Sequence, residues 1–294
     1  LNYLLNIKIM KKNIIYLLIL SLGIFAFSCD PDDPTPEPIQ QAPSIDQTIN
    51  AISEYALVNK IFSDSFSEAD KAAKNGDKQL EAQKYGQAGD YPVVTITPLD
   101  TTTWPKNIKV DYGTSNYVCN DGVKRRGIIN IQTTGFYREA GTEITVTYDG
   151  FYHNDHKVEG TMKVVNAGRN DNNNLVYNVT IAEGKITTPQ DKIIYFNENT
   201  SREWAAGENT VFDPCDDNYL IGGSQDGMSS DSIEYTLTVQ QKLDILACCK
   251  YVRAGVLKIS ITGILPFTVN FDGSTCDEAN IVATINGAEC PITM

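Results

Sequence analysis

Histidine and positive charge are both scarce in this chain. Its 294 residues include two histidines, and 24 Lys and Arg residues against 37 Asp and Glu residues give a net charge of −13. A surface this acidic repels the phosphates of nucleic acids and of anionic lipid headgroups. We therefore expect no nucleic-acid partner.

The motifs that catalysis and cofactor binding commonly need are missing as well. There is no Gly-x-Ser-x-Gly, no phosphate loop and no dinucleotide fingerprint, and residues 222–224 (Gly-Gly-Ser) lack the Lys-Ser/Thr of a phosphate loop. Because both histidines lie in one expected turn, a general base for a catalytic triad is hard to place. A glycosidase pair of Glu159 with Glu198 or Glu203 is the alternative. The sequence predicts a protein that is not an enzyme and uses no cofactor.

Long apolar runs are absent after residue 29. The one such run, Ile14–Phe27, is about 14 residues long, whereas a membrane-spanning helix needs about 20. It follows two lysines and ends in Ala-Phe-Ser-Cys29, which resembles the lipobox of a bacterial lipoprotein signal peptide. The resemblance implies that residues 1–28 are removed and that Cys29 is lipidated. Met10 is the expected start, so residues 1–9 lie upstream of it.

Residues 29–43 have the composition of a tether, with clustered prolines and acidic residues and little apolar surface to bury. An acidic cluster directly after the lipidated cysteine resembles the surface-export signal of Bacteroidota lipoproteins. It implies an outer-membrane protein that is anchored by lipid and faces the cell surface. A periplasm-facing protein is the alternative.

One helix is expected, from Ser44 to about Gly76, at the start of a single domain that spans residues 44–294. Ser44 is a candidate N-cap and Gly76 a candidate stop. Apolar residues recur at steps of three and four, which predicts an amphipathic helix packed on a sheet. They are Ile45, Ile49, Ile52, Ala56, Leu57, Ile61, Phe62, Phe66, Ala69 and Ala73.

After Tyr91, runs rich in Val, Ile, Thr, Tyr and Phe alternate with Gly, Asn and Asp clusters, which predicts strands and turns. Strict alternation of polar and apolar residues predicts antiparallel pairing. The fold class is therefore mainly β: a large antiparallel curved sheet or a two-sheet sandwich with one N-terminal amphipathic helix. The expected strands are Val93–Thr97, Asn107–Tyr112, Gly127–Thr133, Glu143–Tyr152, Lys157–Asn166, Leu175–Glu183, Lys192–Asn197, Tyr219–Gly222, Ile233–Gln241, Gly255–Thr262, Phe267–Phe271, Ile281–Ile285 and Glu289–Thr293.

Six cysteines remain besides Cys29, which predicts disulfides in an oxidising compartment. No Cys-x-x-Cys occurs, so a zinc-thiolate site is the weaker interpretation. A two-residue turn at Gly263-Ile264 would place Cys276 beside Cys249, and we predict that these two pair. The full set of candidates is Cys119, Cys215, Cys248, Cys249, Cys276 and Cys290.

Residues 90–294 carry a family resemblance. The segments that carry it are Tyr112-Gly113, Cys119–Gly127, Tyr137-Arg138, Thr145–Tyr148, Val158–Thr161, Arg202–Trp204 and Phe271–Asp277. With these segments the chain resembles a group of β-rich Bacteroidota lipoproteins, which implies a location and a fold but no activity.

Three weak site hypotheses remain. His153 and His156 flank the expected turn Asn154-Asp155, where two imidazoles could share a metal; solvated turn residues are the simpler interpretation. Trp104, Trp204 and Tyr195 could form a sugar-stacking platform, although strand aromatics more often belong to a core. The Asn-rich loop 170–174 has the oxygen ligands of a calcium site, but turn chemistry explains these residues without a metal and is the favoured interpretation.

The function expected from the sequence is a structural or binding role in the cell envelope, with the membrane as a partner through lipid on Cys29. A glycan or an envelope protein is the expected ligand. The alternatives are a glycan-binding surface module of an outer-membrane uptake system, and a carrier of a hydrophobic ligand, which needs an apolar cavity under the sheet.

Overall fold

The structure is a computed structural model that describes residues 42–79, 92–100, 102–210 and 214–292. The expected signal peptide, the lipidated Cys29 and all but the last two residues of the expected tether lie outside these ranges. Within them, no helix combines the length and the hydropathy that crossing a membrane requires.

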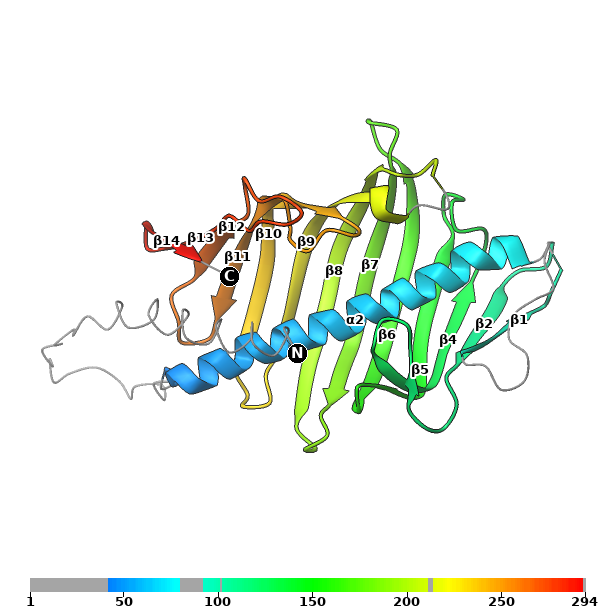
Figure 1. The fold of residues 1–294 in the computed structure, drawn as a ribbon, viewed down its shortest axis with the longest axis horizontal. Coiled ribbons are helices and arrows are strands. Elements are labelled where there is room, and N and C mark those ends of the chain that lie inside the picture. The colour runs from blue at the N-terminus through cyan, green and yellow to red at the C-terminus, as the bar shows by residue number, and fades with distance from the viewer. Residues whose placement is uncertain (1–41, 80–91, 101, 211–213, 293–294) are drawn as a thin grey trace, which may run out of the picture.

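The described strands form one open antiparallel sheet with a helix across one face (Figure 1). The strands follow the chain order β1-β2-β4 through β14, and β3 pairs with β4 off this path. The mainly β fold with one N-terminal helix is confirmed, and of the two expected architectures the single sheet is the one present. The strands are β1 (Val93–Thr97), β2 (Lys106–Asp111), β3 (Tyr117–Val118), β4 (Lys124–Thr133), β5 (Glu143–His153), β6 (His156–Arg169), β7 (Leu175–Thr187), β8 (Ile193–Ala206), β9 (Asn218–Met228), β10 (Glu234–Leu246), β11 (Ala254–Ile261), β12 (Phe267–Asn270), β13 (Ile281–Ile285) and β14 (Ala288–Ile292).

All the expected strands are present, but β8 and β9 are much longer than expected. The part of β8 beyond the expected end at Asn197 contains Glu198 and Thr200, which are buried polar residues on the face that carries the core. Because buried polar residues interrupt the apolar alternation, the sequence pattern ends before the strand does. The short strand β3 was not expected at all.

The expected turn at Gly263-Ile264 is wrong by one residue. The Ile264 amide donates to the Ile261 carbonyl, so Thr262 and Gly263 are the central residues of the turn, and Gly263 has a φ of 79°. A positive φ at this position suits glycine, which has no Cβ to clash. The expected hairpin at Asn154-Asp155 is confirmed, with φ of 48° and 64° at its central residues.

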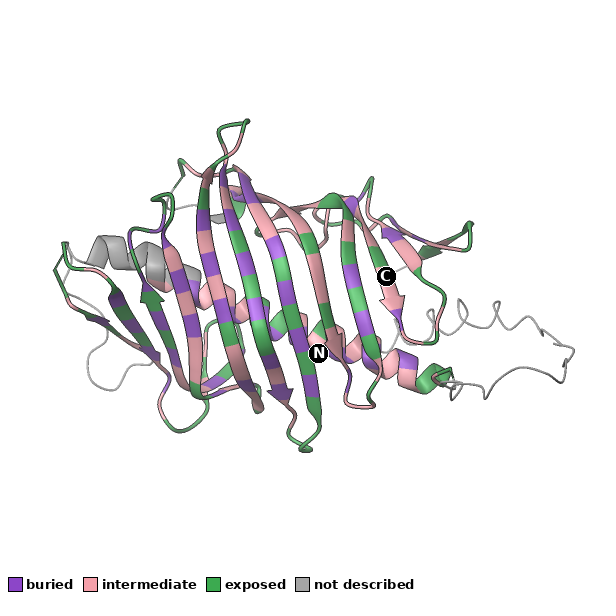
Figure 2. Cartoon of the chain, turned by 180° about the vertical axis from the view of Figure 1, so that it is seen from behind, coloured by how far each residue is buried: buried purple, intermediate pink, exposed green. Residues whose placement is uncertain are grey.

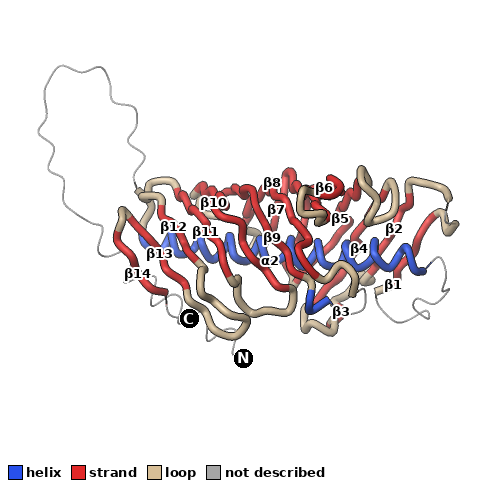
Figure 3. Tube along the Cα trace, turned by 90° about the horizontal axis from the view of Figure 1, so that it is seen from above, coloured by secondary structure: helices blue, strands red, loops and turns tan. Residues whose placement is uncertain are grey.

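The helix α2 (Ile45–Gln79) begins at a capping box. The Gln47 amide donates to Ser44 Oγ at 3.2 Å, and the Ser44 amide donates to Gln47 Oε1 at 2.9 Å. The two bonds satisfy amides that a helix start leaves unpaired. Seen from above, the strands form an arc and the helix runs along its inner side (Figure 3).

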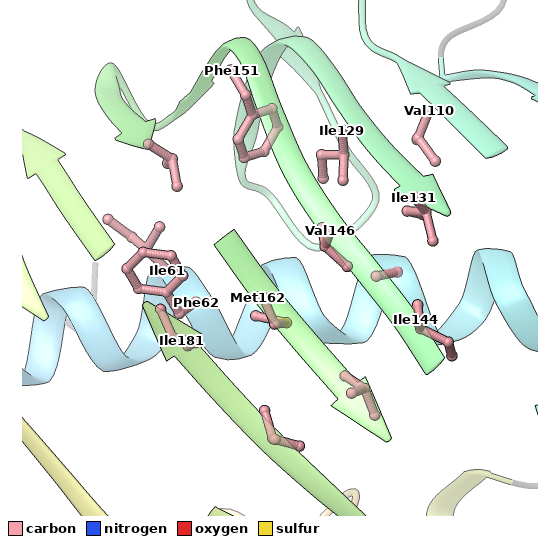
Figure 4. Close-up of a cluster of buried hydrophobic side chains, with 14 of the residues drawn as sticks. Ile61, Phe62, Val110, Ile129, Ile131, Ile144, Val146, Phe151, Met162 and Ile181 are labelled. Atoms are coloured by element: carbon pink, nitrogen blue, oxygen red, sulfur yellow. The ribbon is translucent and has the colours of Figure 1, made fainter. Parts of the chain in front are cut away.

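Phe62 is at the centre of the core between helix and sheet (Figure 4). Its ring stacks on Phe196 at a centroid distance of 5.5 Å and meets Tyr148 edge-on at 6.1 Å. Side chains from β2 to β8 surround it, so the concave face of the sheet is filled by the helix. The labelled residues in Figure 4 are Ile61, Phe62, Val110, Ile129, Ile131, Ile144, Val146, Phe151, Met162 and Ile181.

Only part of the apolar stripe that was expected along the helix is buried in the structure. Ile61, Phe62 and Ala69 are buried as expected, but Val58 is fully buried and was not in the stripe, while Ala56 is exposed. The helix is therefore rotated relative to the expectation. The cause is a set of polar ties to the sheet.

These ties follow the helix from one end of the sheet to the other. Near its start, Asn50 Nδ2 donates to Asp231 at 2.7 Å and Glu54 accepts from the Ser230 amide at 2.6 Å. Further along, the Tyr55 hydroxyl donates to Gln225 Oε1 at 2.7 Å. Buried polar groups need such partners, so the ties fix which side of the helix faces the strands.

Two disulfides cross-link the second half of the sheet. Cys249 pairs with Cys276 (Cα–Cα 4.5 Å), the pair that the sequence predicts, and Cys248 pairs with Cys215 (4.8 Å). Cys215 belongs to a short 3-10 helix, η1 (Pro214–Asp216), ahead of β9. The apolar cluster in this half is small, with Tyr235, Leu237 and Ile261 as its buried members.

Candidate functional site

The sheet has a second face, opposite the helix, and along its strands exposed residues alternate with buried ones (Figure 2). Side chains alternate along a strand, so each strand that buries apolar residues against the helix turns its other residues outward. In β2, for example, Ile108 and Val110 are buried while Asn107 and Lys109 are exposed. We call this surface the outer face.

On the outer face, one residue from each strand lines up into a continuous row, which we call the polar row. Each member is the register partner of the next, so the row crosses thirteen strands, or about 58 Å at about 4.8 Å per strand. Its members, from β1 to β14, are Thr97, Asn107, Gln132, Thr145, Lys163, Thr180, Asn199, Ser224, Thr238, Lys258, Thr268, Thr284 and Glu289.

The polar row contains no apolar and no aromatic residue, and none of its members is buried. Its charged members are Lys163, Lys258 and Glu289, and Lys163 pairs with Glu143 at 2.9 Å. Uncharged hydroxyl and amide groups thus dominate a surface of a chain whose net charge is −13. The uncharged members of the row carry groups that both donate and accept hydrogen bonds.

At the β1 end, the row passes through an open hollow of about 520 Å³. The side chains of β1, β2, β4 and β5 on the outer face line it. Twist makes a sheet saddle-shaped, and a saddle is concave along one diagonal. The lining side chains on this face, which we call the hollow, are Thr95, Thr97, Asn107, Lys109, Asn130, Gln132, Thr145 and Thr147.

The two histidines do not form a metal site. His153 and His156 are register partners across the hairpin, as expected, but His153 is buried and its Nε2 lies 2.8 Å from Asp64 of the helix. His156 Nδ1 instead contacts the carbonyl of Asn154 at 2.9 Å. Among the described residues, no group of three His, Cys, Asp or Glu side chains is placed to hold a metal ion.

The expected aromatic platform is not assembled. Trp204 is 3% exposed, stacks on Tyr219 and donates from Nε1 to Asp217 at 3.0 Å. Tyr195, 41% exposed, is an odd number of positions away in β8 and so lies on the opposite face. Trp104 is half-buried, with its ring edge-on to Phe136 at 4.9 Å.

The carboxylates considered for catalysis are held by cations. The Lys242 ammonium and the Asn174 amide bind Glu203 at 2.6 and 2.9 Å, and they lower the pKa of that carboxyl to about 2. Hydrogen bonds from Lys157 lower the pKa of Glu159 too. A glycosidase acid needs a raised pKa, which neither of these residues has. The Asn-rich loop closes on itself, since Asn170 Oδ1 accepts the amides of residues 172 and 174 at 3.0 Å.

Two of the six candidate cysteines, Cys119 and Cys290, are unpaired, and both are half-buried. Burial raises the pKa of the Cys119 thiol, although Arg125 beside it acts in the opposite direction. A raised pKa reduces the thiolate fraction and with it the reactivity of the group.

A search of protein-family models, of curated proteins and of solved structures found no match to this chain. The proposed function therefore rests on the sequence and on the geometry of the site. The polar row was missed by sequence reasoning, although the Thr-x-Thr repeats at 95–97, 145–147 and 236–238 were a usable signal. Such repeats put two threonines on the same face of one strand.

Proposed function

We propose that this chain is a non-enzymatic protein of the cell envelope, anchored to the outer membrane by lipid on Cys29 and facing the cell surface. Its role is binding, through the outer face of the sheet. The lipobox pattern and the acidic tether support the proposed location at the outer membrane. The observation that supports the binding role is the polar row, because an unbroken row of polar residues over thirteen strands contributes nothing to the core.

The hydrophobic-carrier alternative lacks support. A carrier needs an apolar cavity on the concave side of the sheet. The helix occupies that side, and Val58, Ile61 and Phe62 are at most 1% exposed there. The aromatic version of glycan binding loses its basis as well, since Trp204 is buried and Tyr195 is on the other face.

The anchor is tested by labelling cells with radioactive palmitate. The native chain should take up label and fractionate with the outer membrane. Cys29→Ala should take up none, because its lipid acceptor is gone. Uptake of label by Cys29→Ala would contradict the proposed anchor. Recovery of the native chain from the medium or the cytoplasm would contradict the proposed location.

The binding role is tested by thiol accessibility on intact cells, with a membrane-impermeant maleimide. Thr180→Cys places a thiol at the centre of the polar row, and Lys60→Cys places one on the exposed side of the helix. Thr180→Cys should react more slowly on cells than in detergent, because a bound partner covers it. Lys60→Cys should react equally in both, after subtraction of the native background from Cys119 and Cys290.

Equal rates for Thr180→Cys on cells and in detergent would show an uncovered face and contradict the binding role. If neither thiol reacts on intact cells but both react in detergent, the domain faces the periplasm and the surface location is wrong.

A further inference from the structure

Four threonine hydroxyls point into the hollow with unused hydrogen-bonding capacity. Thr95 and Thr97 come from β1, and Thr145 and Thr147 come from β5. Their backbones pair within the sheet, but none of the four hydroxyls makes a hydrogen bond to another residue that the structure describes. A hydroxyl offers one donor and two acceptor positions, so each can bind a ligand group that donates or one that accepts.

Between the two threonine pairs lies an amide pair. Gln132 Nε2 donates to Asn107 Oδ1 at 3.1 Å, which fixes the orientation of both side chains. The Gln132 carbonyl oxygen and the Asn107 amino group then face outward, as one acceptor and one donor. A positioned amide pair has already lost its rotamer freedom, so a ligand that binds it has less ordering to impose.

The hollow carries no uncompensated charge. Lys109 is its one charged lining residue, and its Nζ lies 2.9 Å from Asp111. A charged polymer would find no counter-charge here. An apolar ligand would leave the threonine hydroxyls and the amides without water or a partner, at a cost for each group.

We propose that the hollow binds an uncharged, hydroxyl-rich glycan chain, and that the polar row is the track along which the chain extends. This proposal rests on the binding role proposed above and names its ligand class. Sugar hydroxyls both donate and accept, as the lining groups do. The hollow spans four strands, or about 14 Å. Beyond it, Thr180, Asn199 and Ser224 continue the same chemistry at one residue per strand.

The test is affinity electrophoresis of the full chain in detergent, in native gels that contain a polysaccharide. Dextran, pullulan, xylan and glucomannan are the neutral probes, and heparin and polygalacturonate are the charged ones. The native chain should be retarded in at least one neutral gel and in neither charged gel. Retardation in the charged gels alone, or in no gel, overturns the proposal.

Two matched double variants locate the site. Thr145→Val with Thr147→Val removes both β5 hydroxyls of the hollow and keeps the β-branched shape. Thr236→Val with Ser260→Ala removes two hydroxyls from β10 and β11, on the same face but outside both the hollow and the polar row. The first pair should weaken retardation by about tenfold or more, which corresponds to two lost hydrogen bonds. The second pair should stay within about threefold of the native chain.

Equal losses of retardation in the two double variants would show that the hollow is not the binding site. Unchanged retardation of the β5 variant would contradict the proposed site as well. Thermal melting of both variants shows that each is folded. The anchor and accessibility experiments do not depend on sugar. If those two experiments give the expected results while no gel retards the chain, the proposed glycan ligand is wrong and the binding role stands. If Thr180→Cys reacts equally fast on cells and in detergent, the binding role itself is wrong.

Discussion

At the scale of single residues, the contact between helix and sheet is unusually polar. Asp64 lies 2.8 Å from His153 and 2.9 Å from Lys60, and the Tyr112 hydroxyl donates to Glu68 at 2.8 Å. Partial burial acts to raise the pKa of Asp64, but the hydrogen bonds from His153 and Lys60 outweigh it and leave that pKa below its usual value. The ionised carboxylate is thus favoured in the folded chain.

A lowered pKa in the folded state makes the stability depend on pH. The contribution of Asp64 is fully present above the unfolded-state pKa of about 4 and is lost as the pH falls through the lower, folded value. Asp64→Asn should therefore lower the free energy of unfolding at pH 7 by about 1–3 kcal/mol. The difference from the native chain should shrink below about pH 4.

Urea denaturation at pH 7 and at pH 3 measures the difference. Asp155→Asn is the control, because that carboxylate pairs with Arg126 at the exposed surface, where ion pairs contribute little. An Asp64→Asn deficit that is as large at pH 3 as at pH 7 would show that the interaction does not depend on the ionised carboxylate.

At the scale of elements, one helix supports most of a very wide sheet. A sheet needs an apolar face to be covered, and here a single helix of 35 residues covers it diagonally (Figure 1). Phe62 and Val58 bury themselves against β8 and its neighbours, while Asn50 and Glu54 bind the turn between β9 and β10. Aromatic contact in the middle and polar contacts along its length together set the path of the helix.

Removal of the central ring should loosen this arrangement. Phe62→Ala leaves a cavity between Phe196 and Tyr148 and should cost about 3–5 kcal/mol of unfolding free energy. Phe136→Ala is the matched change at a ring that is 38% exposed, and it should cost far less. Chemical denaturation measures both, and equal costs would mean that the helix does not pack on the sheet at residue 62.

At the scale of the whole molecule, the two halves of the sheet are stabilised differently. The large core lies against β2 to β8, whereas the cluster around Tyr235 and Leu237 has few buried members. The adjacent cysteines at the end of β10 connect that strand to η1 on one side and to the loop before β13 on the other. A small core is commonly supplemented by disulfides.

The Cys249–Cys276 bridge closes a separation of 27 residues. The double variant Cys249→Ser with Cys276→Ser should lose about 2–4 kcal/mol of stability, because the unfolded chain regains the freedom that the bridge removes. Cys290→Ser, at an unpaired cysteine, should change the stability little. Denaturation curves decide this, and peptide mapping that finds Cys249 joined to any residue but Cys276 would reject the pairing.

Much of this architecture is visible in the sequence because it is local. Alternation identifies strands such as Glu143–His153, and a serine three residues before a glutamine marks the helix start. The rotation of the helix was not predictable, since Glu54 and Tyr55 find their partners more than 150 residues away. The burial of the aromatic residues was not predictable either, because it depends on contacts outside the strand. The sequence of β8 alone does not indicate that Trp204 is buried while Tyr195 is exposed.

The sequence by itself determined most of the elements, the antiparallel pairing and the cysteine supply, because each depends on neighbouring residues. Only the tertiary structure decided that the strands form one sheet, that the helix fills its concave side, and that polar residues of thirteen strands fall into one row. Register decides the last point. A slip of one residue between two strands would turn the next strand's polar residues to the helix side, and the burial of each strand's apolar residues against the helix prevents it.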